Sequence, residues 1–133
     1  MHVRNRISLA VLSLTVGLAH ASPGYAEYRV TIVGPANSTP TAINSAGAVV
    51  GNYPVSATAS RSFVNWGKGV VTLGTLGGTS TSAVAINDKG QVLGNWLTPG
   101  GQQRGFVYYQ GKQRDIGTIP GRGTFFVDIN NAG

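Results

Sequence analysis

Side chains that carry chemistry are scarce in this sequence. Its 133 residues include no cysteine, two histidines and four acidic residues, against ten lysines and arginines. The absence of cysteine excludes disulfide bonds and thiolate metal sites. Only 11% of the residues are charged, whereas glycine occurs 20 times. This composition argues against a charged coiled coil or an acidic disordered tail, and it favours short strands joined by turns.

The first 26 residues have the three parts of a secretory signal peptide. Arg4 and Arg6 supply the basic region, and a largely apolar run of 13 residues follows at 7–19. A membrane-spanning helix needs roughly 20 apolar residues, so this run predicts a signal helix and no stable membrane span after cleavage. Two small-x-small sequences, of the kind that precede a cleavage site, end at Ala21 and Ala26. We predict cleavage after Ala26, with Ala21 as the alternative, and a secreted, periplasmic or cell-surface location.

The predicted mature chain, residues 27–133, has no histidine, because His2 and His20 both belong to the signal segment. This excludes Ser-His-Asp and Cys-His catalysis and histidine-based zinc sites. The remaining lysines and arginines are spread singly, so no nucleic-acid patch is predicted. We therefore predict no enzyme activity and no cofactor. The acidic residues of this chain are Glu27, Asp88, Asp115 and Asp128. None of them has an acidic residue at the equivalent position of the repeat described below.

The mature chain repeats with a period of 43 residues. Residues 30–90 set against 73–133 give 19 identities in 61 pairs without a gap, where roughly 4 or 5 would arise from this composition by chance. Ala42-Ile43-Asn44 matches Ala85-Ile86-Asn87, and Ile129-Asn130 repeats the last two. The domain organisation predicted from this is a signal peptide at 1–26, then about 2.5 copies of a repeat at 27–133.

Each repeat predicts four short strands. In the second copy, the extended runs 82–87 and 91–96 flank the turn 87–90, where an Asn side chain that bonds to the backbone and a glycine with positive φ are favoured. A second hairpin joins 104–109 to 113–116. Several strands are apolar on both faces, and such sheets need a cover on each face. We predict an all-β fold of tandem four-stranded antiparallel sheets resembling β-propeller blades, with a β-solenoid as the alternative.

The residues that carry this pattern resemble the HAF-repeat family of extracellular repeat proteins. They are Ala-Ile-Asn-Asp-Lys-Gly-Gln-Val-Leu-Gly at 85–94, the aromatic strand at 106–111 and Leu-Gly-Thr-Leu-Gly-Gly at 73–78. The resemblance covers essentially all of 28–133, and it implies export and a repeat fold without catalytic residues. One departure is clear: the His-Ala-Phe tripeptide that names the family is Arg-Ser-Phe at 61–63 and Arg-Gly-Phe at 104–106.

About 2.5 repeats are too few to close a propeller, which has four to eight blades. The last predicted strand, 126–130, has no partner in its own repeat. We therefore expect an incomplete propeller truncated at 133, a fragment of a longer repeat protein. An open strand edge also predicts self-association. A ring of several copies is the less favoured interpretation.

The function that these patterns favour is a non-catalytic binding or scaffold role at or beyond the cell envelope, with a glycan or envelope component as ligand. The alternative is a carbohydrate-binding or carbohydrate-active module that uses exposed aromatics with Asp115 and Asp128. A gene remnant without independent function is the third hypothesis. For the turn at Asn87–Asp88, turn capping is favoured over calcium binding. The candidate residues for stacking on a ligand are Trp66, Trp96 and Tyr109, although packing between repeats is the favoured role for each.

Overall fold

The computed structural model describes residues 15–16, 28–29 and 31–133. The predicted signal helix and its cleavage sites at Ala21 and Ala26 lie outside the described residues, apart from Thr15 and Val16. These two residues form a short strand, β1 (Thr15–Val16), instead of a helix, and β1 pairs antiparallel with β2 (Tyr28–Arg29). Within the described ranges, no helix long and apolar enough to cross a bilayer is found.

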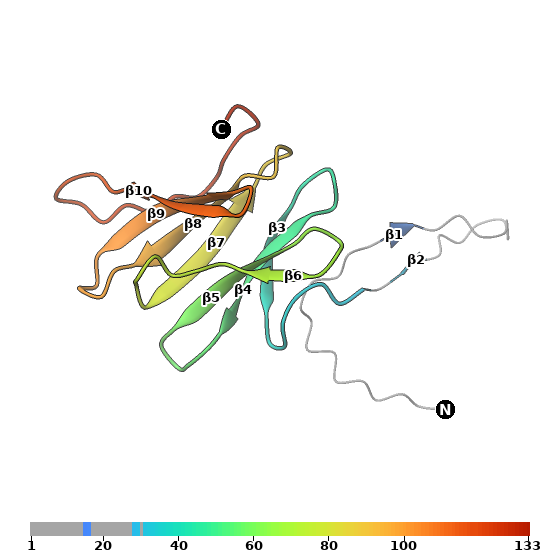
Figure 1. Cartoon of the computed structure of the whole chain (residues 1–133), viewed down its shortest axis with the longest axis horizontal. Helices are drawn as coiled ribbons and strands as arrows, with labels where there is room; N and C mark the ends of the chain where they lie inside the picture. Colours follow the sequence, from blue (N-terminus) through green and yellow to red (C-terminus); the bar gives the residue numbers. More distant parts are fainter. Residues whose placement is uncertain (1–14, 17–27, 30) are drawn as a thin grey trace, which may run out of the picture.

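The all-β prediction is confirmed by two four-stranded antiparallel sheets (Figure 1). In each sheet the strands are paired in chain order as a meander. The strands of these sheets lie within two residues of the predicted ranges, but the strand predicted at 126–130 is not formed. The first sheet contains β3 (Thr39–Ile43), β4 (Val49–Pro54), β5 (Ser60–Asn65) and β6 (Val70–Thr72), and the second contains β7 (Ser80–Ile86), β8 (Val92–Leu97), β9 (Gln103–Tyr109) and β10 (Lys112–Gly117).

The turns that open the two sheets have the predicted chemistry. The Oδ1 atom of Asn44 accepts a hydrogen bond from the Ala48 backbone N–H at 2.9 Å, and Asn87 does the same for Gln91 at 2.9 Å. The glycine of each turn, Gly47 or Gly90, has a φ of 80°. Asparagine caps the turn with its side chain, and only glycine adopts this φ without strain. The turn residues therefore fix the register of each first hairpin.

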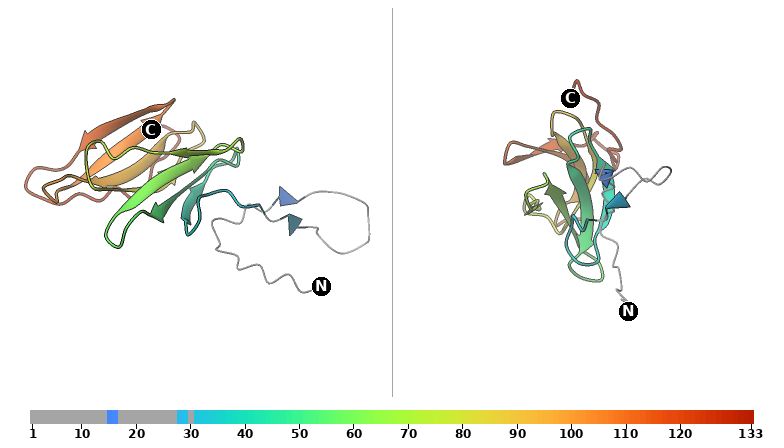
Figure 2. Two further views of the ribbon diagram at one scale, coloured as in Figure 1. Left: turned by 60° about the horizontal axis from the view of Figure 1, so that its bottom comes forward. Right: turned by 90° about the vertical axis from the view of Figure 1, so that its right-hand side faces the viewer.

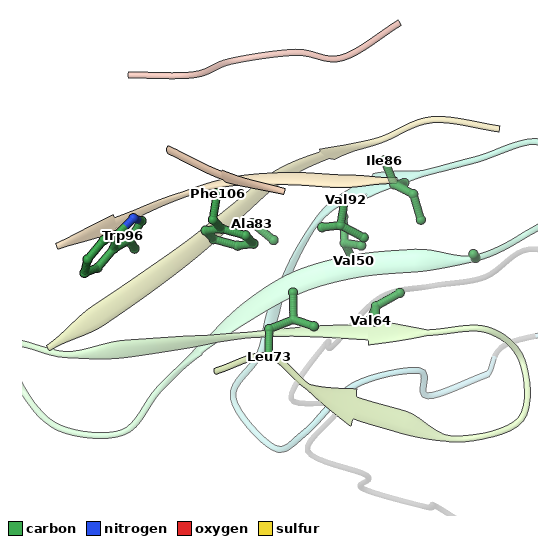
Figure 3. Close-up of a cluster of buried hydrophobic side chains, with 9 residues drawn as sticks. Val50, Val64, Leu73, Ala83, Ile86, Val92, Trp96 and Phe106 are labelled. Atoms are coloured by element: carbon green, nitrogen blue, oxygen red, sulfur yellow. The ribbon is translucent and has the colours of Figure 1, made fainter. Parts of the chain in front are cut away.

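The two sheets pack face to face around one apolar core (Figure 2). Val50 and Val64 of the first sheet, with Leu73 directly after β6, meet a face of the second sheet that includes Val92 and Phe106 (Figure 3). Phe106 and Val92 are fully buried. Because both faces of these strands are apolar, stacking the sheets removes from water the surface that a single sheet would leave exposed.

Hydrogen bonds also join the two sheets. Oδ1 of Asn52 accepts hydrogen bonds from the Ala83 backbone N–H at 2.7 Å and from the Ser62 hydroxyl at 2.8 Å. Nδ2 of Asn52 donates to the Ala83 carbonyl oxygen at 2.9 Å. The Asn44 side chain also donates to the Asn87 carbonyl oxygen at 3.1 Å. These bonds satisfy backbone groups of the second sheet and of its first turn that the contact between the sheets buries.

Residues 124–130 lie against the second sheet without forming a strand. No strand pairing is found for them in the described part of the chain. An ideal Cβ on Gly105 would lie 2.3 Å from the Phe126 ring. The neighbouring side chains of Phe125 and Val127 are 70% and 79% exposed. This segment is therefore anchored at Phe126 and open on its other side.

Candidate functional site

The Trp96 side chain belongs to a polar cluster on the second sheet. Its indole N–H donates to Oδ1 of Asp115 at 3.2 Å, and the Arg104 guanidinium pairs with Oδ2 of Asp115. The carbon at the centre of that guanidinium lies 5.9 Å from the centre of the Trp96 ring. Hydrogen bonds from Arg104, and to a lesser extent from Gly117 and Trp96, lower the pKa of the Asp115 carboxyl below its usual value. Asp115 is therefore an ionised structural partner of Arg104.

The equivalent positions of the first sheet carry a weaker version of this cluster. Tyr53, 43 residues before Trp96, donates its hydroxyl to Oγ1 of Thr72 at 3.4 Å.

Trp96 itself is only 8% exposed. It lies in the core between the sheets (Figure 3). A side chain buried in this way has little ring surface to offer a ligand.

Trp66 packs over the first turn of the second sheet. Two carbons of its six-membered ring lie 3.2 and 3.3 Å from the position that a Cβ atom on Gly90 would occupy. The side chain is still 39% exposed. The ring therefore contacts the next sheet along the chain on one side, and another part of it remains open to solvent.

Tyr109 is the equivalent of Trp66 in the second sheet, and it lines a surface cleft. The cleft has a volume of about 300 Å³. The Tyr109 side chain is 38% exposed, and its hydroxyl accepts a hydrogen bond from the Gln110 side chain at 3.2 Å. Aromatic rings beside polar groups in a concave site are typical of ligand pockets. The residues that line the cleft are Gln91, Val107, Tyr109, Gln110, Lys112 and Arg114.

The cleft is more polar and more positively charged than the same region of the first sheet. At the positions of Gly69 and Val71, 43 residues earlier, the second sheet has Lys112 and Arg114. Arg114 lies opposite Val107 across the β9–β10 pair, so the two side chains share one face of the sheet. Within the described ranges the only salt bridge is that of Arg104 with Asp115. Lys112 and Arg114 thus present two cations without an acidic partner there.

The turns of successive repeats are stacked by hydrogen bonds between residues 43 positions apart. The Asp88 carboxylate accepts from the Ser45 backbone N–H at 2.9 Å and from the Asn131 side chain at 3.0 Å. These bonds, the one from Ser45 first, lower the pKa of Asp88. Three or more acidic, histidine or cysteine side chains do not come together anywhere in the described part of the chain. The oxygens of Asp88 therefore bridge one turn to the next.

Sequence reasoning selected the three aromatics but not the cleft. The sequence does carry a signal for the cleft. Lys112 and Arg114 replace the equivalent Gly69 and Val71, although the nearby aromatic position is kept in both repeats. Of the three aromatics, Tyr109 alone lines this cleft, while Trp66 and Trp96 lie elsewhere. Asp128 accepts a hydrogen bond from the next backbone N–H, that of Ile129, at 2.8 Å. Comparison with known proteins found no family model, no curated protein and no solved structure that matches this chain.

Proposed function

We propose that this protein is an exported, non-catalytic binding scaffold built from blade-like β-sheets of the HAF-repeat kind. The observation that carries the proposal is the stacking of two meander sheets through the same residues 43 positions apart. Asn52 holds Ala83 as Asn95 holds Phe126, and the turns at Asn44 and Asn87 stack in the same way. Four-stranded meanders stacked face to face in series are the arrangement of propeller blades. Such scaffolds commonly bind ligands at their surfaces and loops.

Export is the first testable part of the proposal. When the full chain is expressed in a bacterium with its own leader, we expect the exported protein to begin at Glu27, or at Ser22 if cleavage follows Ala21. Replacing Leu12 with arginine should keep the chain inside the cell, because a charge interrupts the apolar segment that the secretion machinery recognises. N-terminal sequencing and cell fractionation measure both results. A chain that stays in the cytoplasm with an intact N-terminus would contradict export.

The cleft at Tyr109 favours a carbohydrate ligand, the second candidate function. An exposed aromatic ring offers a face for a sugar ring, the Gln91 and Gln110 amides offer hydrogen bonds to hydroxyl groups, and the two cations favour an acidic sugar. Acidic glycans are therefore the class that we expect this site to prefer over neutral ones. In this proposal Lys112 and Arg114 bind the ligand and take no part in catalysis.

A glycan array that contains uronic-acid and neutral polymers tests this preference. We expect Tyr109→Ala, and the double variant Lys112→Gln with Arg114→Gln, to lower the affinity for acidic glycans at least about tenfold, since hydrogen bonds to charged groups contribute about 1.5–3 kcal/mol. Lys68→Gln is the matched control, because Lys68 is an exposed cation on the equivalent hairpin of the first sheet. Equal loss in the control, or binding that is unchanged in both cleft variants, would contradict the site.

A further inference from the structure

The segment 124–130 is held on the second sheet by the contacts that hold β7 on the first. The Phe126 backbone N–H donates to Oδ1 of Asn95 at 2.8 Å, and Nδ2 of Asn95 donates to the Phe126 carbonyl oxygen at 2.9 Å. Asn52 makes the same two bonds to Ala83, at 2.7 and 2.9 Å. At the turn, the Asn87 side chain donates to the Asn130 carbonyl oxygen at 2.9 Å. Residues 124–130 therefore occupy the place of a first strand in a third sheet.

This place differs from the other two in one respect. β3 pairs with β4 and β7 pairs with β8, whereas the described residues provide no strand beside 124–130. Phe125 and Val127 stand at the positions of Ser82 and Val84, which are half-buried in β7. Without a neighbouring strand, the apolar side chains at 125 and 127 are 70% and 79% exposed. An anchored, extended and apolar edge of this kind is a template for another strand.

We propose that residues 124–130 form a strand-acceptor edge that binds an extended strand of a partner polypeptide with the chemistry of β8. That chemistry is two adjacent aliphatic residues followed by glycine and asparagine, as in Val92 to Asn95. β4 has the same order, with Val49 and Val50 before Gly51 and Asn52. The binding mode is addition of an antiparallel strand to an open edge.

The register of β7 with β8 predicts which partner residues meet the acceptor edge. Ile86 pairs with Val92 and Ala83 pairs with Gly94. By equivalence, Ile129 faces the first aliphatic residue of the incoming strand, and Phe126 faces its glycine. A Cβ atom on Gly94 would lie 2.7 Å from the Ser82 carbonyl oxygen. Phe125 is the counterpart of Ser82 on the acceptor edge, so the incoming strand needs glycine at this position to approach closely enough.

A second copy of the chain does not supply this strand in its folded form. Its two matching strands are already paired on both edges, β4 by β3 and β5, and β8 by β7 and β9. Its own segment 124–130 reads Thr-Phe-Phe-Val-Asp-Ile-Asn and contains no glycine. The incoming strand must therefore belong to a polypeptide segment whose strand of the β8 kind is unpaired.

A fluorescein-labelled peptide that copies residues 88–98 tests the proposal. We expect the full chain to bind the peptide saturably, as measured by fluorescence anisotropy, with slower amide hydrogen exchange at 124–130 in the complex. The same peptide with the change Gly94→Val should bind at least about tenfold more weakly, because its side chain meets the acceptor backbone. Equal affinity of the two peptides, or no binding by either, would overturn the proposal.

Variants of the chain locate the edge. Phe125→Lys combined with Val127→Lys should lower peptide affinity at least about tenfold, since charges on an edge strand oppose pairing with an apolar strand. Ile32→Lys combined with Val55→Lys is the matched control, because these side chains are 72% and 48% exposed and lie outside the segment. All four positions are exposed, so both variants should fold. Peptide binding that survives the first pair of changes, or a dimer of the chain that the peptide does not dissociate, would refute the assignment.

Discussion

Replacing Gly94 with valine is expected to lower the free energy of unfolding by about 3 kcal/mol. A Cβ atom at this position would lie 2.4 Å from two carbons of the Phe106 ring and 2.7 Å from the Ser82 carbonyl oxygen. The ring cannot withdraw, because Phe106 is fully buried in the core between the two sheets. The carbonyl belongs to the neighbouring strand β7, so moving it would disturb the β7–β8 pair. Urea denaturation followed by circular dichroism measures the change.

Gly100→Val is the matched control for this substitution. The nearest heavy atom to a Cβ atom on Gly100 would be Oγ1 of Thr98, at 3.9 Å, and Gly100 does not adopt a positive φ. We expect this exposed variant to stay within about 0.5 kcal/mol of the parent chain. If Gly94→Val unfolded at the same urea concentration as Gly100→Val, the close packing of β8 against Phe106 would be refuted.

Replacing Asn52 with alanine is expected to cost about 3 kcal/mol of stability. The change leaves the Ala83 N–H and carbonyl without this partner, and it removes the acceptor of the Ser62 hydroxyl. Ala83 and Ser62 are both fully buried, so water cannot replace the lost bonds. Because Asn52 lies on the first sheet and Ala83 on the second, the loss falls on the contact between them. Thermal and urea unfolding of the purified variant measure the effect.

Asn95→Ala provides the comparison for Asn52→Ala. Asn95 makes the equivalent two bonds, but its partner is Phe126 in the segment 124–130, which packs on only one side. We expect a global loss of about 1 kcal/mol, together with faster amide exchange confined to 124–130. A larger global loss in Asn95→Ala than in Asn52→Ala would show that the asparagine bonds do not join the sheets in the way described.

The strands, turns and stacking of the sheets follow from the sequence because local rules decide them. The Asn-x-x-Gly turns fix each first hairpin, and strands with adjacent valines, such as Val49 and Val50, require cover on both faces. The second hairpin of each repeat, at 104–109 and 113–116 in the second copy, gives the remaining strands. The predicted boundaries deviate by up to two residues, since strand ends depend on neighbouring strands more than on the residues themselves.

The candidate site was harder to predict because it depends on contacts between distant residues. Trp96 and Tyr109 look alike in sequence, each an aromatic residue in a strand. Trp96 is buried by the opposite sheet and bonded to Asp115, 19 residues later, whereas Tyr109 lines an open cleft. Only the placement of the two sheets separates these environments. The bond from Asn52 to Ala83, 31 residues apart, is likewise invisible to local patterns.

Asn52 and Asn95 each make two hydrogen bonds to the main chain of the neighbouring segment, and the side chain of the bound residue takes no part in them. The bound residue is alanine at position 83 and phenylalanine at position 126, yet the same pair of hydrogen bonds holds both. The larger residue is accommodated by a smaller neighbour, because the Phe126 ring lies against Gly105, at the position that Ser62 occupies beside Ala83. Attachment through main-chain hydrogen bonds thus lets the residue at this position change in size when its neighbour on the preceding sheet changes with it.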